Sequence, residues 1–317
     1  MPPTIARTEH IATWPELPLA DWAGTCHTLH RWTQIVGKVR MALTPLVNHW
    51  WNVTFYVTPR GLTTSTMSHD KLSLAIDFDF IDHRLLIRTS EGAIEHLALE
   101  ARPVADFFAE FMERLRRCGA EVHIWTMPSE IANPVPFDQD FGAAEYDPLW
   151  VERFLQAVRQ ADRVLKNFRA RFIGKASPVH FFWGSFDLAV TRFSGRTAPA
   201  PTGERPNIPN TVVAEAYSHE VSSCGFWPGN GGYGKPAFYV YAYPEPSAYG
   251  ETGLTTPGAY YDRELGQFLL PYDAVRQSAN PDGMILSFLQ ETYEAAADQA
   301  HWDRAALERK AEDVSRP

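Results

Sequence analysis

Hydrophobic residues in the first half of the chain follow first a helical period and then a strand period. Over residues 20–43 they are spaced as on one face of a helix, and Pro45 ends the pattern. Residues 51–58 and 72–80 alternate hydrophobic and polar positions, which is typical of a strand with one buried face. Shorter segments predict strands at 85–88, 94–99 and 122–125, with a helix at 104–117. This half therefore predicts a helix, a group of strands and a second helix.

The second half repeats that order after a segment rich in Pro and Asp, 128–148, which we interpret as a linker. Residues 149–170 have helical periodicity, and a closing helix is expected at 284–299. Between them the pattern predicts strands at 178–183, 186–193, 211–218, 237–243 and 267–270. Long loops are expected at 196–210, which is rich in Pro, and at 244–265.

The repeated order predicts an α+β protein with two similar lobes, each an antiparallel sheet flanked by helices, and a cleft between them. We expect the lobes at residues 1–135 and 136–317, since 317 residues are many for one hydrophobic core. Similar aromatic stretches begin at His49 and at His180, which points to an internal duplication. The alternative is chance similarity between two aromatic-rich strands.

Charge and cysteine content exclude several classes of protein. The formal net charge is −9, from 29 basic and 38 acidic residues, which argues against a nucleic-acid partner. Three widely spaced cysteines form neither a disulfide framework nor a zinc ribbon and favour a cytoplasmic location. No hydrophobic segment approaches the about 18 residues of a membrane span, and the N-terminus lacks the hydrophobic core of a signal peptide. We therefore expect no membrane partner.

Titratable side chains lie among large aromatic ones in two stretches of the second lobe, PVHFFWGSFDLAVTRFSGR (178–196) and TVVAEAYSHEVSSCGFWPGN (211–230). This mixture is typical of a ligand pocket. Together with LHRWTQIVGKVRMAL and NHWWNVTFYVTPRGLTTS upstream, these strings resemble a mainly bacterial family known as domain of unknown function 5996. The resemblance extends to about Pro246 and implies an ordinary full-length member. It implies no activity, cofactor or catalytic residue.

Four histidines and one glutamate form the first candidate site: His49, His83, His180, His219 and Glu220. Imidazole and carboxylate groups are ligands of zinc, iron and other transition metals. None of these residues has the spacing of a metal motif such as HExxH, so the ligands would have to converge from separate strands. The alternative is that each histidine forms a hydrogen bond at a strand end. The cofactor is thus unknown, with zinc or iron as the metals to test.

Two pairs of titratable residues suggest acid–base chemistry. Asp77 and Asp79 share one face of their strand, although lining its solvent side is the simpler interpretation. His219 and Glu220 are adjacent, so they point to opposite faces of a regular strand unless a bulge reorients one.

Two arginines in matching places of the repeat, Arg60 and Arg192, suit the binding of a carboxylate or phosphate. The alternative is a structural salt bridge to Asp187 or Asp79. A glycine-rich loop, Gly229–Lys235, fits part of the P-loop pattern, but Pro236 follows where Ser or Thr is required, so nucleotide binding there is rejected.

The sequence therefore predicts an enzyme that acts on a small anionic or aromatic metabolite in the cleft between the lobes, by acid–base or metal-assisted chemistry. The expected catalytic residues are His180, His219 and Glu220. The expected ligand contacts are Arg192, Arg60, Asp187, Trp183 and Trp227. The alternatives are a non-catalytic protein that binds a small ligand, and a structural protein that forms a homo-oligomer through its aromatic residues.

Overall fold

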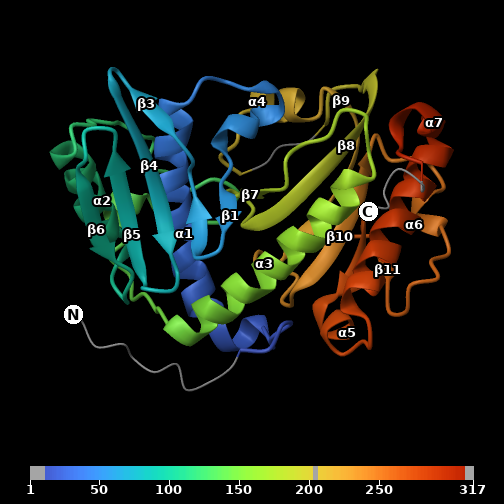
Figure 1. The fold of residues 1–317 in the computed structure, drawn as a ribbon, viewed down its shortest axis with the longest axis horizontal. Helices are drawn as coiled ribbons and strands as arrows, with labels where there is room; N and C mark the ends of the chain where they lie inside the picture. The colour runs from blue at the N-terminus through green and yellow to red at the C-terminus, as the bar shows by residue number, and fades with distance from the viewer. Residues whose placement is uncertain (1–10, 203–205, 311–317) are drawn as a thin grey trace.

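The protein contains two antiparallel sheets flanked by helices (Figure 1). A computed structural model describes residues 11–202 and 206–310. The α+β prediction is confirmed, and in each half a long helix precedes the strands and another follows them. An internal duplication is compatible with this order and stays a prediction.

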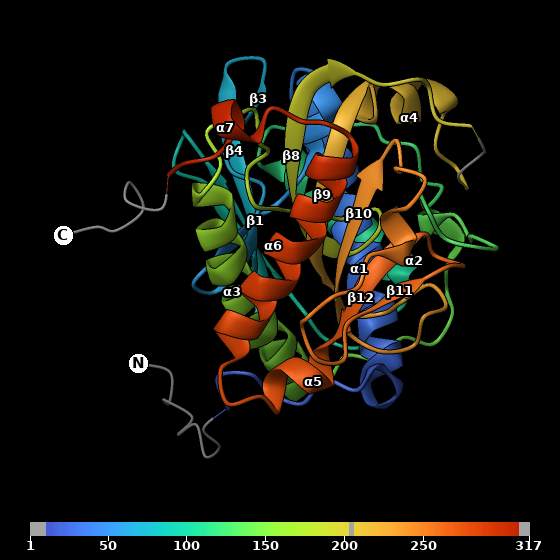
Figure 2. The ribbon, with the colours of Figure 1, turned by 90° about the vertical axis from the view of Figure 1, so that its right-hand side faces the viewer.

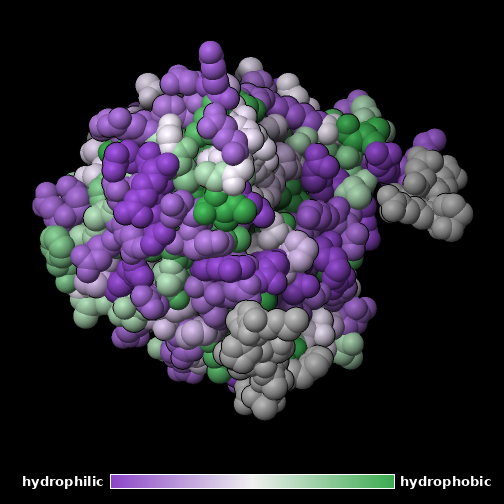
Figure 3. All heavy atoms as spheres, turned by 60° about the vertical axis from the view of Figure 1, so that its left-hand side comes forward, coloured by the Kyte–Doolittle hydropathy of each residue, from purple (hydrophilic) through white to green (hydrophobic). Residues whose placement is uncertain are grey.

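The first sheet has the strand order β1-β2-β4-β5-β6, with β3 paired to one end of β4. Its strands are β1 (Tyr56–Thr58), β2 (Gly61–Thr63), β3 (Met67–His69), β4 (Leu72–Asp79), β5 (Arg84–Thr89) and β6 (Ile94–Ala98). Along β4, Leu74 and Ile76 are buried, whereas Asp77 on the other face forms an ion pair with Arg88. In Figure 3, where the side of the molecule with the first sheet and α2 (Val104–Arg117) comes forward, hydrophilic residues cover most of the surface.

The second sheet has the order β11-β12-β10-β9-β8-β7. Its strands are β7 (His180–Phe182), β8 (Asp187–Thr197), β9 (His219–Trp227), β10 (Ala237–Tyr243), β11 (Tyr260–Asp262) and β12 (Gln267–Pro271). Two long helices, α3 (Pro148–Ala170) and α6 (Pro281–Gln299), pack against each other and cover one face of this sheet (Figure 2). Short helices α5 (Tyr272–Arg276) and α7 (Arg304–Leu307) flank α6.

The first helix, α1 (Leu19–Leu43), stands between the two sheets (Figure 1). Its residues 28–40 are all buried, so the helix is covered on every side. One hydrophobic core includes Trp32 of α1, Phe78 of the first sheet and Phe226 of the second. Phe55 and Phe181 also exchange backbone hydrogen bonds of 2.9 and 2.7 Å between the two halves. The core is therefore continuous through both halves, and the boundary at residue 135 stays a prediction.

Several segments differ from the sequence predictions, and one of them is β11, which lies inside the predicted loop 244–265. Residues 48–53 form a 3-10 helix, η1 (Asn48–Val53), in place of the start of a strand, and within it His49 and Trp50 adopt left-handed backbone conformations with φ of 58° and 60°. Residues 211–218 lie largely in a helix, α4 (Asn210–Ala216), instead of a strand, and residues 122–125 form no strand. The loops contain two further 3-10 turns, η2 (Phe137–Gln139) and η3 (Tyr249–Glu251).

Another difference is β9, a strand inside the second sheet that the sequence did not predict. Its Ser222, Ser223 and Gly225 weaken the hydrophobic alternation that marks a strand. Glycine is required at 225 because a Cβ atom there would lie 2.1 Å from the Leu188 carbonyl oxygen of the neighbouring strand.

Candidate functional site

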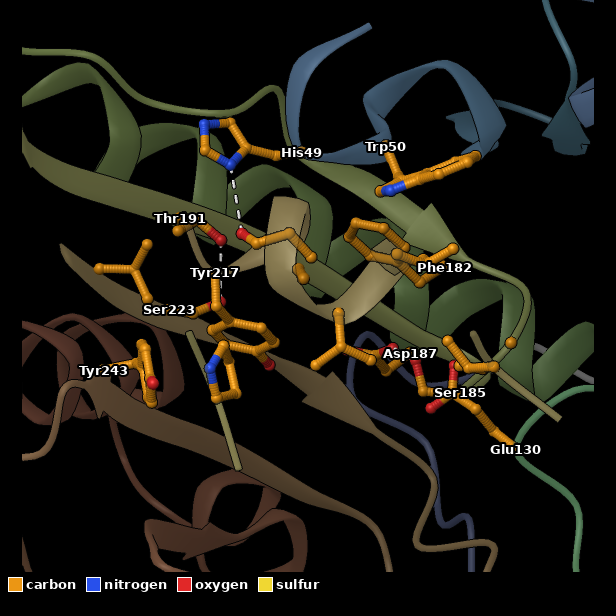
Figure 4. Close-up of a pocket in the computed structure, with 18 of the residues that line it drawn as sticks. His49, Trp50, Glu130, Phe182, Ser185, Asp187, Thr191, Tyr217, Ser223 and Tyr243 are labelled. Atoms are coloured by element: carbon orange, nitrogen blue, oxygen red, sulfur yellow. Dashed lines mark hydrogen bonds between the residues drawn. The ribbon is translucent and has the colours of Figure 1, made fainter. Parts of the chain in front are cut away.

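A cavity of about 940 Å³ lies against the face of the second sheet that α3 and α6 leave uncovered. Side chains alternate along a strand, so every second residue of the central strands faces the cavity. Along β8 these are Asp187, Ala189, Thr191 and Phe193, while Arg192 faces the helices. On the cavity face, the Thr191 and Ser223 hydroxyls lie 2.8 Å apart in a hydrogen bond (Figure 4).

The other walls of the cavity come from η1, α4, the C-terminal part of α1 and the segment around residue 129. Both halves of the chain therefore contribute to the cavity wall, while the cleft between two separate lobes stays a prediction. Its lining is rich in aromatic residues, among them Trp50, Trp51, Trp125, Phe182, Trp183, Trp227, Tyr217, Tyr239, Tyr241 and Tyr243. Ligand sites are commonly concave and apolar with a few oriented polar groups, and a volume of this size is typical of them.

Polar groups gather at one end of the cavity, where Figure 4 shows Glu130, Ser185 and Asp187 together. The Asp187 carboxylate is 7% exposed and accepts hydrogen bonds from the hydroxyls of Ser185 and Tyr239. Burial, followed by the nearby Asp187 charge, holds the pKa of the Tyr239 phenol well above its ordinary value. The phenol therefore stays protonated and donates to Asp187.

A buried lysine lies in the wall formed by α1. Lys38 is 2% exposed, and its Nζ donates to Ser129 Oγ at 3.3 Å. The same Nζ lies 5.0 and 5.9 Å from the ring centroids of Trp125 and Trp183. Burial lowers the pKa of the Lys38 amine to about 8.

His49 lies in the wall formed by η1, and both of its ring nitrogens are engaged. Its Nδ1 lies 3.1 Å from the Ala216 carbonyl oxygen, an acceptor, so Nδ1 carries the proton. Its Nε2 therefore accepts from Lys175 Nζ at 2.6 Å. Burial and then the Lys175 charge lower the pKa of His49, so the ring is neutral at neutral pH. The Nε2 lone pair is occupied, which limits His49 as a general base.

Four of the residues predicted for a site line the cavity: Trp183, Trp227, Asp187 and His49. The Trp183 indole donates to the Val53 carbonyl at 2.7 Å, and the Trp227 indole donates to Asn230 at 2.9 Å. These bonds fix the two rings in the wall.

The predicted catalytic residues His180, His219 and Glu220 do not lie together at the cavity. His180 is 1% exposed, and its Nδ1 lies 3.0 Å from Thr54 Oγ1. His219 contacts the His49 ring at a centroid distance of 5.6 Å, whereas Glu220 forms an ion pair with Arg196 at 2.6 Å. The side chains of His219 and Glu220 thus point to opposite faces of the strand, as expected for adjacent residues.

The five residues predicted as metal ligands form no common cluster. His83 lies in the first half, where its Nδ1 is 2.9 Å from the Tyr146 hydroxyl and its Nε2 is 3.6 Å from Glu152. Among residues 11–202 and 206–310, no group of three or more His, Cys, Asp or Glu side chains is placed to hold a metal ion. The geometry of the described chain therefore offers no zinc or iron site.

Both predicted anion-binding arginines have structural partners away from the cavity. Arg60 forms ion pairs with Asp79 and Asp82 at 2.8 and 2.7 Å, which is the alternative that the sequence left open. Arg192 is buried between α3 and α6, with its guanidinium 3.5 Å from the Phe168 ring centroid and 4.3 Å from that of Tyr293. Burial lowers the pKa of Arg192 to about 10.

Sequence reasoning missed Lys38, Ser129 and Tyr239. A signal for Lys38 was present, because His30, Gln34 and Lys38 recur every four residues and so form a polar stripe along α1. Gln34 exchanges two 2.8 Å hydrogen bonds with the backbone of Ser129, and His30 Nε2 lies 2.7 Å from the Gly184 carbonyl oxygen. The stripe thus fixes the two segments that border the polar end of the cavity.

Comparison with known proteins identifies the family. No curated protein and no solved structure gives a significant match to the chain. Within the described residues, none of the helices is both long and apolar enough to span a membrane. One family model matches residues 14–309, which extends the resemblance well beyond Pro246. The chain therefore belongs to the family of unknown function DUF5996.

Proposed function

We propose that this protein binds a small organic molecule with an aromatic or otherwise apolar body in the cavity. The main observation behind this proposal is the cavity of about 940 Å³, whose lining is rich in aromatic residues. Aromatic rings bury large apolar areas and stack on flat ligands, so they favour such a body. The fixed indoles of Trp183 and Trp227 support a cavity that is preformed rather than created by the ligand.

Binding without catalysis is favoured over the enzyme hypothesis by the state of the histidines. The His49 lone pair is occupied by Lys175, and His180 is buried behind the cavity wall with its Nδ1 bonded to Thr54. Neither imidazole is placed to exchange a proton with a ligand in the cavity.

The binding test is a ligand screen with a cavity-filling variant. A panel of neutral and monoanionic aromatic compounds is screened by thermal shift, and hits are measured by calorimetry. A ligand present at 100 times its Kd stabilises the protein by about 2.7 kcal/mol, which a thermal shift detects. Ala189→Leu places a larger side chain in the cavity and should abolish binding, whereas Ala98→Leu, an exposed site on β6, should leave it unchanged. Equal binding to both variants would reject the cavity as the site.

Catalysis is the second candidate, favoured by the group formed by Ser185, Asp187 and Tyr239 at the polar end. A carboxylate that accepts from two hydroxyls can orient a substrate and exchange a proton with it. Asp187→Asn separates the two candidates for any ligand found. Lost turnover with retained affinity supports an enzyme, and absence of turnover in the unaltered protein supports a binder.

Location and assembly complete the proposal. We place the protein in the cytoplasm, a location supported by three buried free cysteines. Homo-oligomerisation is supported by exposed aromatic residues such as Trp125 and Phe141, which are 55% and 69% exposed. The mass in solution, measured by light scattering, tests it, and a monomer contradicts it.

A further inference from the structure

Lys38 is a buried cation that faces the cavity and has no ion-pair partner within the described chain. Its amine donates a hydrogen bond to Ser129 Oγ and lies near the rings of Trp125 and Trp183. Burial alone lowers its pKa, with no contribution from a nearby carboxylate. Proteins rarely bury a cation without an anionic partner, because the lost hydration is costly. The position therefore points to an anionic partner that residues 11–202 and 206–310 do not supply.

The surroundings hold the Lys38 amine in one place. Ser129 is fixed through its backbone by two hydrogen bonds with Gln34, whose Nε2 donates to the Ser129 carbonyl and whose Oε1 accepts from the Ser129 N–H. Trp183 is fixed by its bond to Val53 and by close packing, since a Cβ on Gly37 of α1 would lie 2.3 Å from its ring. Because the charge is already held in place, a ligand that binds it pays little additional conformational entropy.

The charge balance of the wall limits what that partner can be. Among the described residues that line the cavity, Lys38 is the sole Lys or Arg, whereas Glu130, Asp187 and Glu245 are acidic. Within this described part of the wall, one cation beside three acids does not suit a dianion such as a phosphate monoester. It suits a single negative charge on a molecule whose remaining surface is apolar.

We infer that Lys38 binds the carboxylate of an aromatic carboxylic acid whose ring lies against the tryptophans of the cavity. The inference rests on the proposed function and names the ligand class for that site. Ser129 Oγ, 3.3 Å from Nζ, stands beside the amine as a second donor for the carboxylate. At pH 7 most molecules carry a protonated Lys38, since its pKa of about 8 lies above that pH.

The experiment compares three probes of one shape by calorimetry at pH 7: 2-naphthylacetate, its neutral amide, and 2-naphthyl phosphate. The unaltered protein should bind the carboxylate at least about 10-fold more tightly than the amide, the size of a hydrogen bond between charged groups. The phosphate should bind more weakly than the carboxylate. Lys38→Met should remove the preference and change amide binding by less than about 3-fold, because Met keeps the apolar stem.

Two further variants control for folding and for charge. Ser129→Ala leaves the backbone bonds to Gln34 intact and should weaken carboxylate binding only about 3-fold, as expected for one lost hydrogen bond. Lys166→Met removes an amine from the exposed side of α3 and should leave all three affinities unchanged.

The outcomes separate the inference from the proposed function. If the amide binds as well as the carboxylate, or if the phosphate binds most tightly, the inference is wrong while the proposed function stands. The same holds if Lys38→Met keeps the preference. If none of the three probes binds, the proposed function is rejected and the inference with it.

Discussion

His180 should make the stability of this protein fall between pH 7.5 and pH 5. The imidazole is 1% exposed, and its burial lowers the pKa from 6.5 to about 3, with smaller effects from Arg40 and Arg169. The Thr54 hydroxyl donates to the Trp51 carbonyl at 3.1 Å, so it accepts the Nδ1 proton of His180. A second proton would therefore enter at Nε2 and place a charge inside the core.

The size of the effect follows from proton linkage. Below pH 6.5 the unfolded chain binds a proton at His180 that the folded protein does not, so protons favour the unfolded state. The contribution to stability is complete above pH 6.5, decreases as the pH falls, and is lost fully below about pH 3. Integrated from pH 7.5 to pH 5, the difference is about 2 kcal/mol for this one histidine.

Urea unfolding at both pH values measures this difference. His180→Asn keeps a polar group near the Thr54 hydroxyl but cannot be protonated, so its loss of stability between the two pH values should be about 2 kcal/mol smaller. Phe182→Leu is the control, because the Phe182 ring packs 4.8 Å from the imidazole and does not titrate. It should lower stability equally at both pH values. The reasoning is refuted if His180→Asn and the unaltered protein lose the same free energy.

Three other substitutions test the remaining features. Gly225→Ala should destabilise the fold by about 3 kcal/mol, because the new Cβ would lie 2.1 Å from the Leu188 carbonyl oxygen. An unchanged midpoint of urea unfolding would contradict the close approach of β8 and β9. Arg192→Met should lower the free energy of unfolding by about 2 kcal/mol through loss of cation–π contacts. It should leave ligand affinity unchanged, because Arg192 faces α3 and α6. A weaker affinity in calorimetry would show that Arg192 contributes to the ligand site after all. Gly37→Ala should push the Trp183 ring into the cavity, because the new Cβ would lie 2.3 Å from that ring. The affinity for any cavity ligand should fall about 10-fold, or about 1.4 kcal/mol. An unaltered affinity would show that the Trp183 ring is not fixed.

Much of the fold could be predicted because its elements have clear periods. The helix over 104–117 and the alternation along 72–80 reappear as α2 and β4. The error at α4 came from Thr211, Val212 and Val213, whose branched side chains favour a strand. In the structure the segment begins as a helix after Pro209 and packs against η1, so tertiary contacts outweigh the local preference.

The candidate site was harder to predict, because its residues meet only through the folded chain. The opposite orientation of Asp187 and Arg192 could be predicted from the sequence, because residues five apart on one strand face opposite sides of the sheet. The burial of Lys38 was not readable, because it depends on Trp183 and Ser129, which come from distant segments. The same limit applies to His49, whose state is set by Lys175.

The position of α1 between the sheets has a consequence for how the protein is made. His30 contacts the Gly184 carbonyl, which lies 154 residues further along the chain. At about 5–20 residues per second, His30 is synthesised roughly 8–30 s before that partner. During this time one side of the helix has no cover. That side carries the stripe of His30, Gln34 and Lys38, whose polar atoms water can satisfy until the second sheet arrives. The polar stripe that borders the cavity in the folded protein thus keeps one side of the nascent helix hydrated until the second sheet has been synthesised.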